Sequence, residues 1–540
     1  MTTGKILTNG VFYSLISGSA IADTVEIDEG KISRIGQAKD ILADNPKHKS
    51  IIDLQKSIVI PGFTDSHIHL LAYGLSLQQL DVSTDSREEC ISRVTEKASA
   101  TPPGTWILGH GWDHNHWQGE FGNRQDLDAA SQQHPIYLTH KSLHCAWVNS
   151  MALEIAGITQ GQINPPGGTI LRDERYNPTG ILLENAMNLV QKAIPDPDLS
   201  TIQSAIKVAQ RSLNAFGITS VHDFDPWSVF FAIKAIQQEK SITLRVTKSI
   251  PEKRLAQALV KGMKSGAGDD WVRIGWLKLF ADGALGSQTA AMLDPYQGSD
   301  DCGMLLLDHD ALVAYGQKAL PAGIAMAVHA IGDRANRTVL SAFETLKKDG
   351  NLAIPLLPPR VEHAQIIAAE DIARFSHIGV AASMQPIHAI SDMKMAQRYW
   401  GDRCESAYAW RSLLDQGSQL IFGSDAPVET PNPFFGIAAS LSRRNYKSNE
   451  KSSNGDSWTP HQCLMIHDTL KAYCHTPSQI SGFTGMTGSI KRGMFADLVI
   501  LPSNFFELRP EEIMVTNPTA TMVGGKWVFI NDKIDIELAK

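Results

Sequence analysis

Residues 61–69 read Pro61-Gly-Phe-Thr-Asp-Ser-His67-Ile-His69 and close an apolar run that begins near Ile58. Side chains alternate along a strand, so two histidines two positions apart point to the same side. The spacing alone is a weak signal, because His114-Asn-His116 repeats it elsewhere. The first pair stands out because it closes an apolar strand, and barrel active sites lie at the carboxyl ends of the strands.

The middle of the chain alternates short apolar strands with helical stretches, which is the pattern of a parallel α/β sheet. Eight strands are predicted, and they begin near Ile58, Ile218, Leu244, Val272, Ala325, Arg360, Val380 and Leu420. Eight parallel strands are the number that closes a (β/α)₈ TIM barrel. We therefore assign residues 61–484 to a barrel-shaped catalytic domain.

The two ends of the chain differ from its middle. Residues 1–60 and 485–540 contain short alternating strands separated by tight turns, and we expect them to meet in one small composite β-sandwich. Residues 72–200 are far too long for one βα unit. We interpret them as a large insertion after the first barrel strand, over the barrel mouth. Lys447–Asp456 is predicted to be a low-complexity loop.

Composition narrows the class of protein. The formal charge of −8 over 540 residues argues against a nucleic-acid-binding or anionic-membrane-binding surface. No segment reaches the roughly 18 apolar residues of a membrane span. Six scattered cysteines without a C-x-x-C pair indicate a reducing compartment, so we expect a cytoplasmic protein. The expected partner is a small-molecule substrate and not a nucleic acid or a membrane. The oligomeric state stays open, with a homodimer among the alternatives.

Further polar groups stand at or near the ends of predicted strands, namely Lys278, His329, His363 and Asp425. Lys278 lies inside an apolar run, where a lysine without a partner tends to lose its proton. Each group alone is better explained as a hydrogen-bonded core residue. Together with the two histidines of residues 61–69, however, they make six such groups on five strands of one barrel. Four imidazoles, a carboxylate and a lysine that can become a carbamate suit one or two Zn²⁺-like ions.

Several motifs are similar to those of one protein family. They are Pro61-Gly-Phe-Thr-Asp-Ser-His67-Ile-His69, Leu277-Lys278-Leu-Phe-Ala-Asp282-Gly-Ala-Leu-Gly-Ser-Gln-Thr-Ala, Val328-His329-Ala-Ile-Gly-Asp333-Arg-Ala, Glu362-His363-Ala-Gln, Gln385-Pro386, Gly423-Ser-Asp425-Ala-Pro-Val and, in the insertion, Gly111-Trp-Asp-His. On these residues the chain resembles the amidohydrolase superfamily over nearly its whole length. The resemblance is to its amidohydrolase-3 or YtcJ-like branch, which includes N-substituted formamide deformylases.

The resemblance implies a set of ligands for two divalent ions, with zinc as the expected metal. For the first ion they are His67, His69 and Asp425, and for the second they are His329 and His363. Lys278, carboxylated by CO₂, would bridge the two ions. Such ions lower the pKa of bound water toward neutrality and create hydroxide. Asp425 would accept the proton of this water and pass it to the departing amine.

Four further residues are candidates for substrate binding, namely His144, His222, Asp282 and His388. His222 and His388 follow predicted strands, and helix capping or loop packing is the alternative role for each. Asp282 is more typical of a turn residue than of a direct substrate ligand. The residues before His144 are Lys-Ser-Leu, which departs from the family's pattern and weakens the case for substrate contact there. The histidines at positions 110, 114 and 116 favour a packed lid over a separate metal site.

We therefore expect a metal-dependent hydrolase that cleaves a non-peptide C–N bond of the amide type, such as an N-substituted amide. A cyclic amide, an amidine and an ester stay open as alternatives for the same metal centre. A non-catalytic scaffold is a further alternative. It is disfavoured because proteins of that kind lack some of the ligands, whereas this chain carries the complete set.

Overall fold

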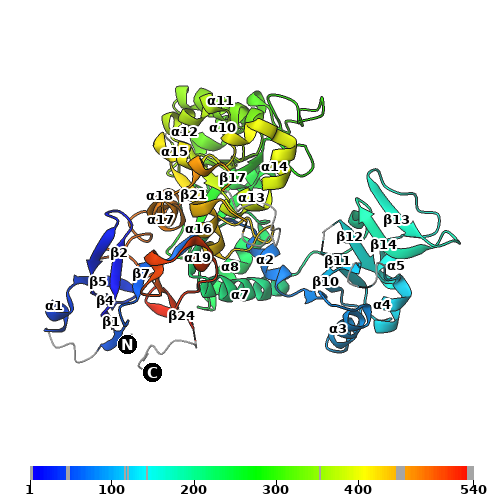
Figure 1. The fold of residues 1–540 in the computed structure, drawn as a ribbon, viewed down its shortest axis with the longest axis horizontal. Coiled ribbons are helices and arrows are strands. Elements are labelled where there is room, and N and C mark those ends of the chain that lie inside the picture. The colour runs from blue at the N-terminus through cyan, green and yellow to red at the C-terminus, as the bar shows by residue number, and fades with distance from the viewer. Residues whose placement is uncertain are drawn as a thin grey trace. The chain divides into compact units, whose positions relative to one another are not determined.

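The computed structural model describes residues 4–43, 49–114, 117, 121–141, 144–351, 354–445 and 457–531. The chain forms two compact units (Figure 1), one from Met1–Gly74 with Ile202–Lys540 and the other from Leu75–Thr201. The predicted loop Lys447–Asp456 and His116 lie outside the described residues.

The larger unit is built on an eight-stranded parallel sheet. In chain order its strands are β8 (Phe63–Ile68), β15 (Ile218–Asp223), β16 (Arg245–Pro251), β17 (Val272–Phe280), β18 (Met326–Ala330), β19 (Arg360–His363), β20 (Ala381–Met384) and β21 (Leu420–Phe422). Each strand pairs with the next, and a bridge between Ile68 and Ala426 joins the end of the first strand to the loop after the last. The predicted (β/α)₈ barrel is confirmed.

The first predicted strand is divided in the structure. The apolar run from Ile58 forms β7 (Ile58–Pro61), which pairs with β22 (Leu498–Leu501) in a different sheet, and the barrel strand β8 begins only at Phe63. Gly62 separates the two strands, and a Cβ there would come within 2.1 Å of Thr219 Oγ1. The predicted assignment of the run from Ile58 to the first barrel strand is therefore wrong, because the chain passes from one sheet to the other at Gly62.

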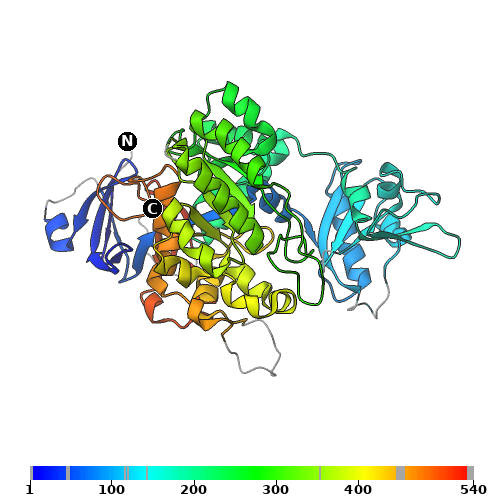
Figure 2. The same cartoon turned by 90° about the horizontal axis from the view of Figure 1, so that it is seen from above.

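Helices surround the barrel strands (Figures 1 and 2). The longer ones are α7 (Leu199–Ala215), α8 (Ser228–Gln238), α10 (His309–Ala319), α11 (Asp333–Lys348) and α16 (Pro433–Ser442). In α11, Val339, Leu340 and Phe343 are spaced so that they share one buried face, and α11 packs against β18. Among the described residues, no helix is long and apolar enough to cross a membrane.

Strands from both ends of the chain share one sheet, blue and red in Figure 1. Its six strands, in spatial order, are β24 (Lys526–Ile530), β23 (Ala520–Val523), β22, β7, β2 (Val11–Ser14) and β3 (Ser19–Ala22). A second sheet contains β5 (Lys31–Gly36), β4 (Thr24–Asp28), β1 (Lys5–Thr8) and β6 (Ser50–Asp53). The two sheets share an apolar core in which Phe12, Val25 and Met522 are fully buried.

Residues Leu75–Thr201 fold into a unit with a sheet of its own, coloured cyan in both views (Figures 1 and 2). The strands, in spatial order, are β13 (Gly168–Arg172), β14 (Pro178–Glu184), β12 (Cys145–Val148), β11 (Ile136–His140), β10 (Ile107–Trp112) and β9 (Leu80–Asp81). Helices α3 (Arg87–Ser99), α4 (Arg124–Ala130) and α5 (Ser150–Ile155) pack against this sheet. This stretch is therefore a compact folded unit.

A buried ion pair links the barrel to the terminal sheet. Arg245 is the first residue of β16, and Asp497 directly precedes β22. Arg245 Nη2 donates to Asp497 Oδ1 at 2.9 Å. Both side chains are almost fully buried, and Gly524 N donates to the same carboxylate at 2.8 Å. Removing one partner would leave the other charge unpaired in the interior, which is strongly destabilising.

Asp497→Asn should therefore lower the free energy of unfolding by about 3–5 kcal/mol, measured from the shift of the urea midpoint. The control is Glu239→Gln, which breaks the exposed pair of Glu239 with Lys207. That variant should cost less than about 1 kcal/mol, because water screens exposed pairs. Equal midpoints for the two variants would contradict an anchoring role for the buried pair.

Candidate metal centre

The end of the first barrel strand is tied to the loop after the last one. Asp425 N donates to the His67 carbonyl at 2.7 Å, and His69 N donates to the Ala426 carbonyl at 3.0 Å. Asp425 has a φ of 60°, in the left-handed region that few residues other than glycine adopt. These constraints bring Asp425 to His67 and His69 at the carboxyl end of the barrel.

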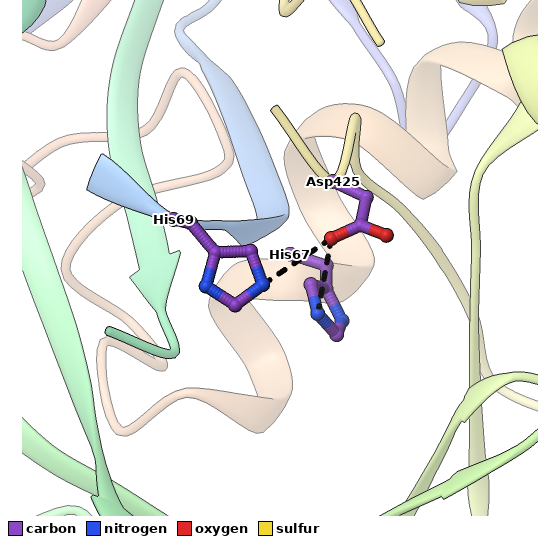
Figure 3. Close-up of side chains that lie close together, drawn as sticks. All are labelled: His67, His69 and Asp425. Atoms are coloured by element: carbon purple, nitrogen blue, oxygen red, sulfur yellow. Dashed lines mark ion pairs between the residues drawn. The ribbon is translucent and has the colours of Figure 1, made fainter. Parts of the chain in front are cut away.

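Three predicted ligands therefore face one another (Figure 3). Asp425 Oδ1 lies 3.6 Å from His67 Nε2 and 3.4 Å from His69 Nε2. Ligand atoms around a tetrahedral zinc ion, with bonds of about 2.0–2.2 Å, lie about 3.4 Å apart. This trio of donors thus fits a divalent cation in both chemistry and spacing.

Each histidine of the trio is held from behind by a carboxylate. His67 Nδ1 lies 2.6 Å from Glu362 Oε2, and His69 Nδ1 lies 3.3 Å from Asp225 Oδ1. A carboxylate accepts hydrogen bonds, so each Nδ1 is the donor and each Nε2 is the atom offered to a cation. Burial lowers the pKa of His67 to about 4. Burial also acts to lower the pKa of His69, but hydrogen bonds to Asp225 and Asp425 raise it to about 10, so a cation must displace a proton there.

A cavity of about 410 Å³ borders the trio. All six predicted ligands line it, namely His67, His69, Lys278, His329, His363 and Asp425. Its apolar wall consists of Phe280, Leu285, Ile331, Met395 and Val428. Such a cavity, mostly apolar with a few convergent polar groups, is typical of a site for a small molecule.

His363 reaches the centre through an irregular strand end. It directly follows Glu362, and its φ of 74° interrupts the alternation of β19. Its Nδ1 lies 2.9 Å from Gln385 Oε1, which leaves Nε2 for a cation. The ligand atoms of His363, His388 and Asp425 lie within 4.8 Å of one another. Asp425 is therefore common to two groups of donors.

Two of the predicted ligands, His329 and Lys278, line the cavity, but their hydrogen-bond and ring contacts are with groups outside the trio. His329 Nε2 donates to the Gly283 carbonyl at 2.9 Å, so this nitrogen faces the backbone. Lys278 is 5% exposed, and its ammonium lies 4.7 Å from the ring centre of Phe224 and 5.0 Å from that of Phe280. Burial lowers the pKa of Lys278 to about 8. Near neutral pH this lysine therefore has an appreciable neutral fraction.

Arg360 fixes the carboxylate behind His67. Its Nη2 donates to Glu362 Oε2 at 2.8 Å, and its Nη1 donates to His222 Nδ1 at 2.9 Å. His222, a predicted substrate contact, is thus brought to Arg360 and not to the cavity. Sequence reasoning missed Glu362 and Asp225. Alternation along β19, which places Arg360 and Glu362 on one face, is the signal that could have found the first.

His388 and Asp282, two other predicted substrate contacts, differ in their position relative to the cavity. His388 lines the cavity, whereas Asp282 does not. Asp282 accepts backbone N–H bonds of 2.9–3.0 Å from Ala291, Ile331 and Gly332, so it organises a turn.

His144 lies in the Leu75–Thr201 unit, where its exposed ring is 2.9 Å from Glu184, and substrate contact by it stays a prediction. In the same unit His114 Nδ1 lies 3.3 Å from His140 Nε2. The role of the histidine cluster that includes His110 also stays a prediction.

Residues 50–529 match the Amidohydrolase family. The chain belongs to this family. Over 546 residues it is 29% identical to the YtcJ protein of Bacillus subtilis (strain 168), covering 96% of this chain and 98% of that one. It is 24% identical to an N-substituted formamide deformylase of Arthrobacter pascens, covering 96% and 97% of the two chains. The crystal structure of an uncharacterized metal-dependent hydrolase from Pyrococcus horikoshii OT3 is 27% identical, with a TM-score of 0.78 over 94% of this chain and 99% of that chain.

These similarities confirm the resemblance predicted from the motifs. They also establish the general activity, since the chain belongs to the Amidohydrolase family and shares the fold of a metal-dependent hydrolase. The chain is therefore an enzyme of metal-dependent hydrolysis, and the trio at the barrel end supplies donors suited to the cation.

Glu362→Gln should weaken metal binding about 10- to 100-fold, because loss of a carboxylate behind a ligating histidine has effects of this size. Competition with a chelator measures the affinity, and circular dichroism checks that the variant folds. Glu26→Gln is the matched control, since Glu26 is a buried glutamate of the terminal sheet that pairs with Lys49. Unchanged metal affinity in a folded Glu362→Gln protein would contradict the positioning role.

Proposed function

We propose that the chain hydrolyses a non-peptide C–N bond in a small N-substituted amide. The observation that carries the proposal is the position of Asp425, whose carboxylate faces two histidine ligands and also lines the cavity. Amines are poor leaving groups unless they are protonated, so the reaction needs a group that accepts a proton and returns it. The name of the Arthrobacter pascens relative, an N-substituted formamide deformylase, supports an amide of this type.

Zinc is the cation that we propose for the trio, because imidazole and carboxylate donors at tetrahedral spacing suit it. When bound, a divalent cation would polarise the substrate carbonyl and lower the pKa of water. His67 and His69 keep their orientation through the carboxylates behind them. Asp425 accepts a proton from water and delivers it to the amide nitrogen as the C–N bond breaks. The apolar wall of the cavity excludes bulk water and accepts an apolar substituent.

We propose further that Lys278 is carboxylated. Its lowered pKa of about 8 leaves about a tenth of the amine neutral at pH 7, and the neutral amine is the form that adds CO₂. An ammonium group beside a divalent cation would be repelled, whereas a carbamate supplies two negatively charged oxygens. The carbamate would bridge the first cation to a second one beside His363.

Asp425→Asn should lower kcat by about 10²–10⁴-fold, because the amide keeps the size of the side chain but cannot accept a proton. Metal content should fall much less. The acidic limb of the kcat/KM profile should disappear, since it reports protonation of Asp425 coupled to the water that it deprotonates. The control is Asp371→Asn, the same change at a buried aspartate that pairs with Arg337 and does not line the cavity, and it should keep the wild-type profile. Wild-type kcat in Asp425→Asn would move the proton acceptor elsewhere.

Lys278→Ala should lose activity by about 10²-fold or more, as expected for removal of a positioned catalytic group, together with part of the metal. Added short carboxylic acids such as acetate should restore some of both, because they supply the missing oxygens. Lys278→Arg keeps a cation but cannot form the carbamate, so the same acids should not rescue it. Activity measurements and elemental analysis test the prediction. Full activity and metal content in either variant would contradict carboxylation.

A further inference from the structure

Two buried side chains of the cavity wall carry polar atoms without a partner. Gln365 is 4% exposed and His388 is 6% exposed, and both line the cavity beside the metal ligands. Within the part of the chain that the structure describes, no group hydrogen-bonds to Gln365 Oε1 or to either ring nitrogen of His388. Buried polar atoms are nearly always paired, because an unpaired one is costly. These atoms therefore point to a ligand that supplies the missing partners.

In two other buried glutamines the side-chain carbonyl oxygen has a partner within the chain. Gln210 Oε1 accepts from Thr243 N at 2.8 Å. Gln462 Oε1 accepts from Ser412 N at 3.1 Å, and its Nε2 donates to Ser412 Oγ at 2.7 Å. Gln365 differs from both in lining a cavity with its carbonyl oxygen unpaired. Packing alone therefore does not account for a glutamine at this position.

The orientation of Gln365 is set by its neighbours. Its Nε2 lies 3.5 Å from Asp392 Oδ2, and Tyr408 Oη donates to the same carboxylate oxygen at 2.7 Å. Tyr408 N also donates to the backbone carbonyl of Gln365 at 2.6 Å. Because a carboxylate only accepts, the NH₂ group is the end of the amide that faces Asp392. The carbonyl oxygen is then the end left to accept from a ligand.

His388 connects this wall to the metal centre. It lies on α13 (Pro386–Ser391), four residues before Asp392. Its ring is nearly parallel to that of His363, with the ring centres 6.2 Å apart, and its ligand atom lies within 4.8 Å of those of His363 and Asp425. A neutral imidazole offers one N–H donor and one acceptor. The wall therefore presents a hydrogen-bond acceptor and a hydrogen-bond donor next to the proposed reaction centre.

We propose that Gln365 and His388 form a subsite that recognises the N–H group and an oxygen of a secondary amide. Gln365 Oε1 accepts the amide N–H, and His388 donates to an oxygen of the same ligand. The subsite favours amides that keep a hydrogen on nitrogen and disfavours tertiary amides, in which an alkyl group replaces that hydrogen. The inference rests on the proposed amide hydrolysis at this centre and narrows its substrate class.

A pair of hydroxamates tests the subsite without turnover. Benzohydroxamic acid and N-methylbenzohydroxamic acid each bind zinc through two oxygens, and they differ in the N–H that Gln365 would accept. In calorimetry with the zinc-loaded full chain, the N–H compound should bind about 10- to 100-fold more tightly, because N-methylation leaves a buried acceptor unpaired.

Three variants separate the contributions. Gln365→Met keeps the approximate length of the side chain and removes the acceptor, so the preference for the N–H compound should disappear. His388→Leu should weaken both hydroxamates by a similar factor, about tenfold, and preserve the preference. Gln257→Met makes the first change at an exposed position of α9 (Leu255–Val260) and should alter neither affinity. Elemental analysis should find the zinc content of all three variants unchanged.

Each part of the proposal has a contrary result of its own. Equal affinities of the two hydroxamates for the wild-type protein, or a preference that survives in Gln365→Met, would overturn the role of Gln365. Loss of zinc from His388→Leu would make His388 a metal ligand and overturn its role as a donor. Binding of neither hydroxamate to the zinc-loaded protein would remove the metal centre as the site of reaction, and the proposed function would fail together with the subsite.

Discussion

Two backbone hydrogen bonds join the end of β8 to the loop after β21, and the candidate metal centre depends on them. Asp425 N donates to the His67 carbonyl, and His69 N donates to the Ala426 carbonyl. Asp65 reinforces the junction, because its buried carboxylate accepts from His67 N at 3.1 Å and from the backbone of the loop. A slip of one residue in this register would turn both histidines to the opposite face of the strand. Closure of the barrel and assembly of the ligand trio are therefore the same structural event.

Beneath the ligands the barrel interior carries charge in place of the aliphatic layers that usually fill such barrels. Arg360 is fully buried, and it donates to Glu362 on its own strand, to the Ser66 carbonyl on β8 at 2.6 Å and to Ser383 Oγ on β20 at 2.7 Å. A buried charge without its partner is costly, so the guanidinium and the carboxylate have to stay together. Because Glu362 is fixed in this way, its second contact, with His67, is fixed as well. The packing of the barrel thereby determines the direction of the proposed metal ligand His67.

Position at a strand end was sufficient to predict that six polar groups line one cavity, but alternation fails where the backbone is irregular. His363 directly follows the inward-facing Glu362, so regular alternation would turn it away, and only its φ of 74° brings it to the centre. The apolar run from Ile58 gave a correct strand in the wrong sheet, because hydrophobicity does not specify which strands pair. His222 shows a second limit of prediction from the sequence. Its sequence position allowed substrate contact, whereas its partner, Arg360, lies 138 residues away along the chain and could not be inferred from local pattern.

Asp425 gives the centre two oxygens with different surroundings. Oδ1 is the atom that lies 3.4–3.6 Å from the Nε2 atoms of His67 and His69, and Figure 3 shows the other oxygen directed away from both rings. In the proposed reaction Oδ1 would hold the cation together with the two histidines, and the second oxygen would exchange the proton. Both functions depend on the same left-handed backbone and the same bond to the His67 carbonyl. Cation binding and proton transfer therefore have one structural origin in the barrel closure. The proposed choice of substrate does not share it, because Gln365 and His388 take no part in the two backbone hydrogen bonds that close the barrel.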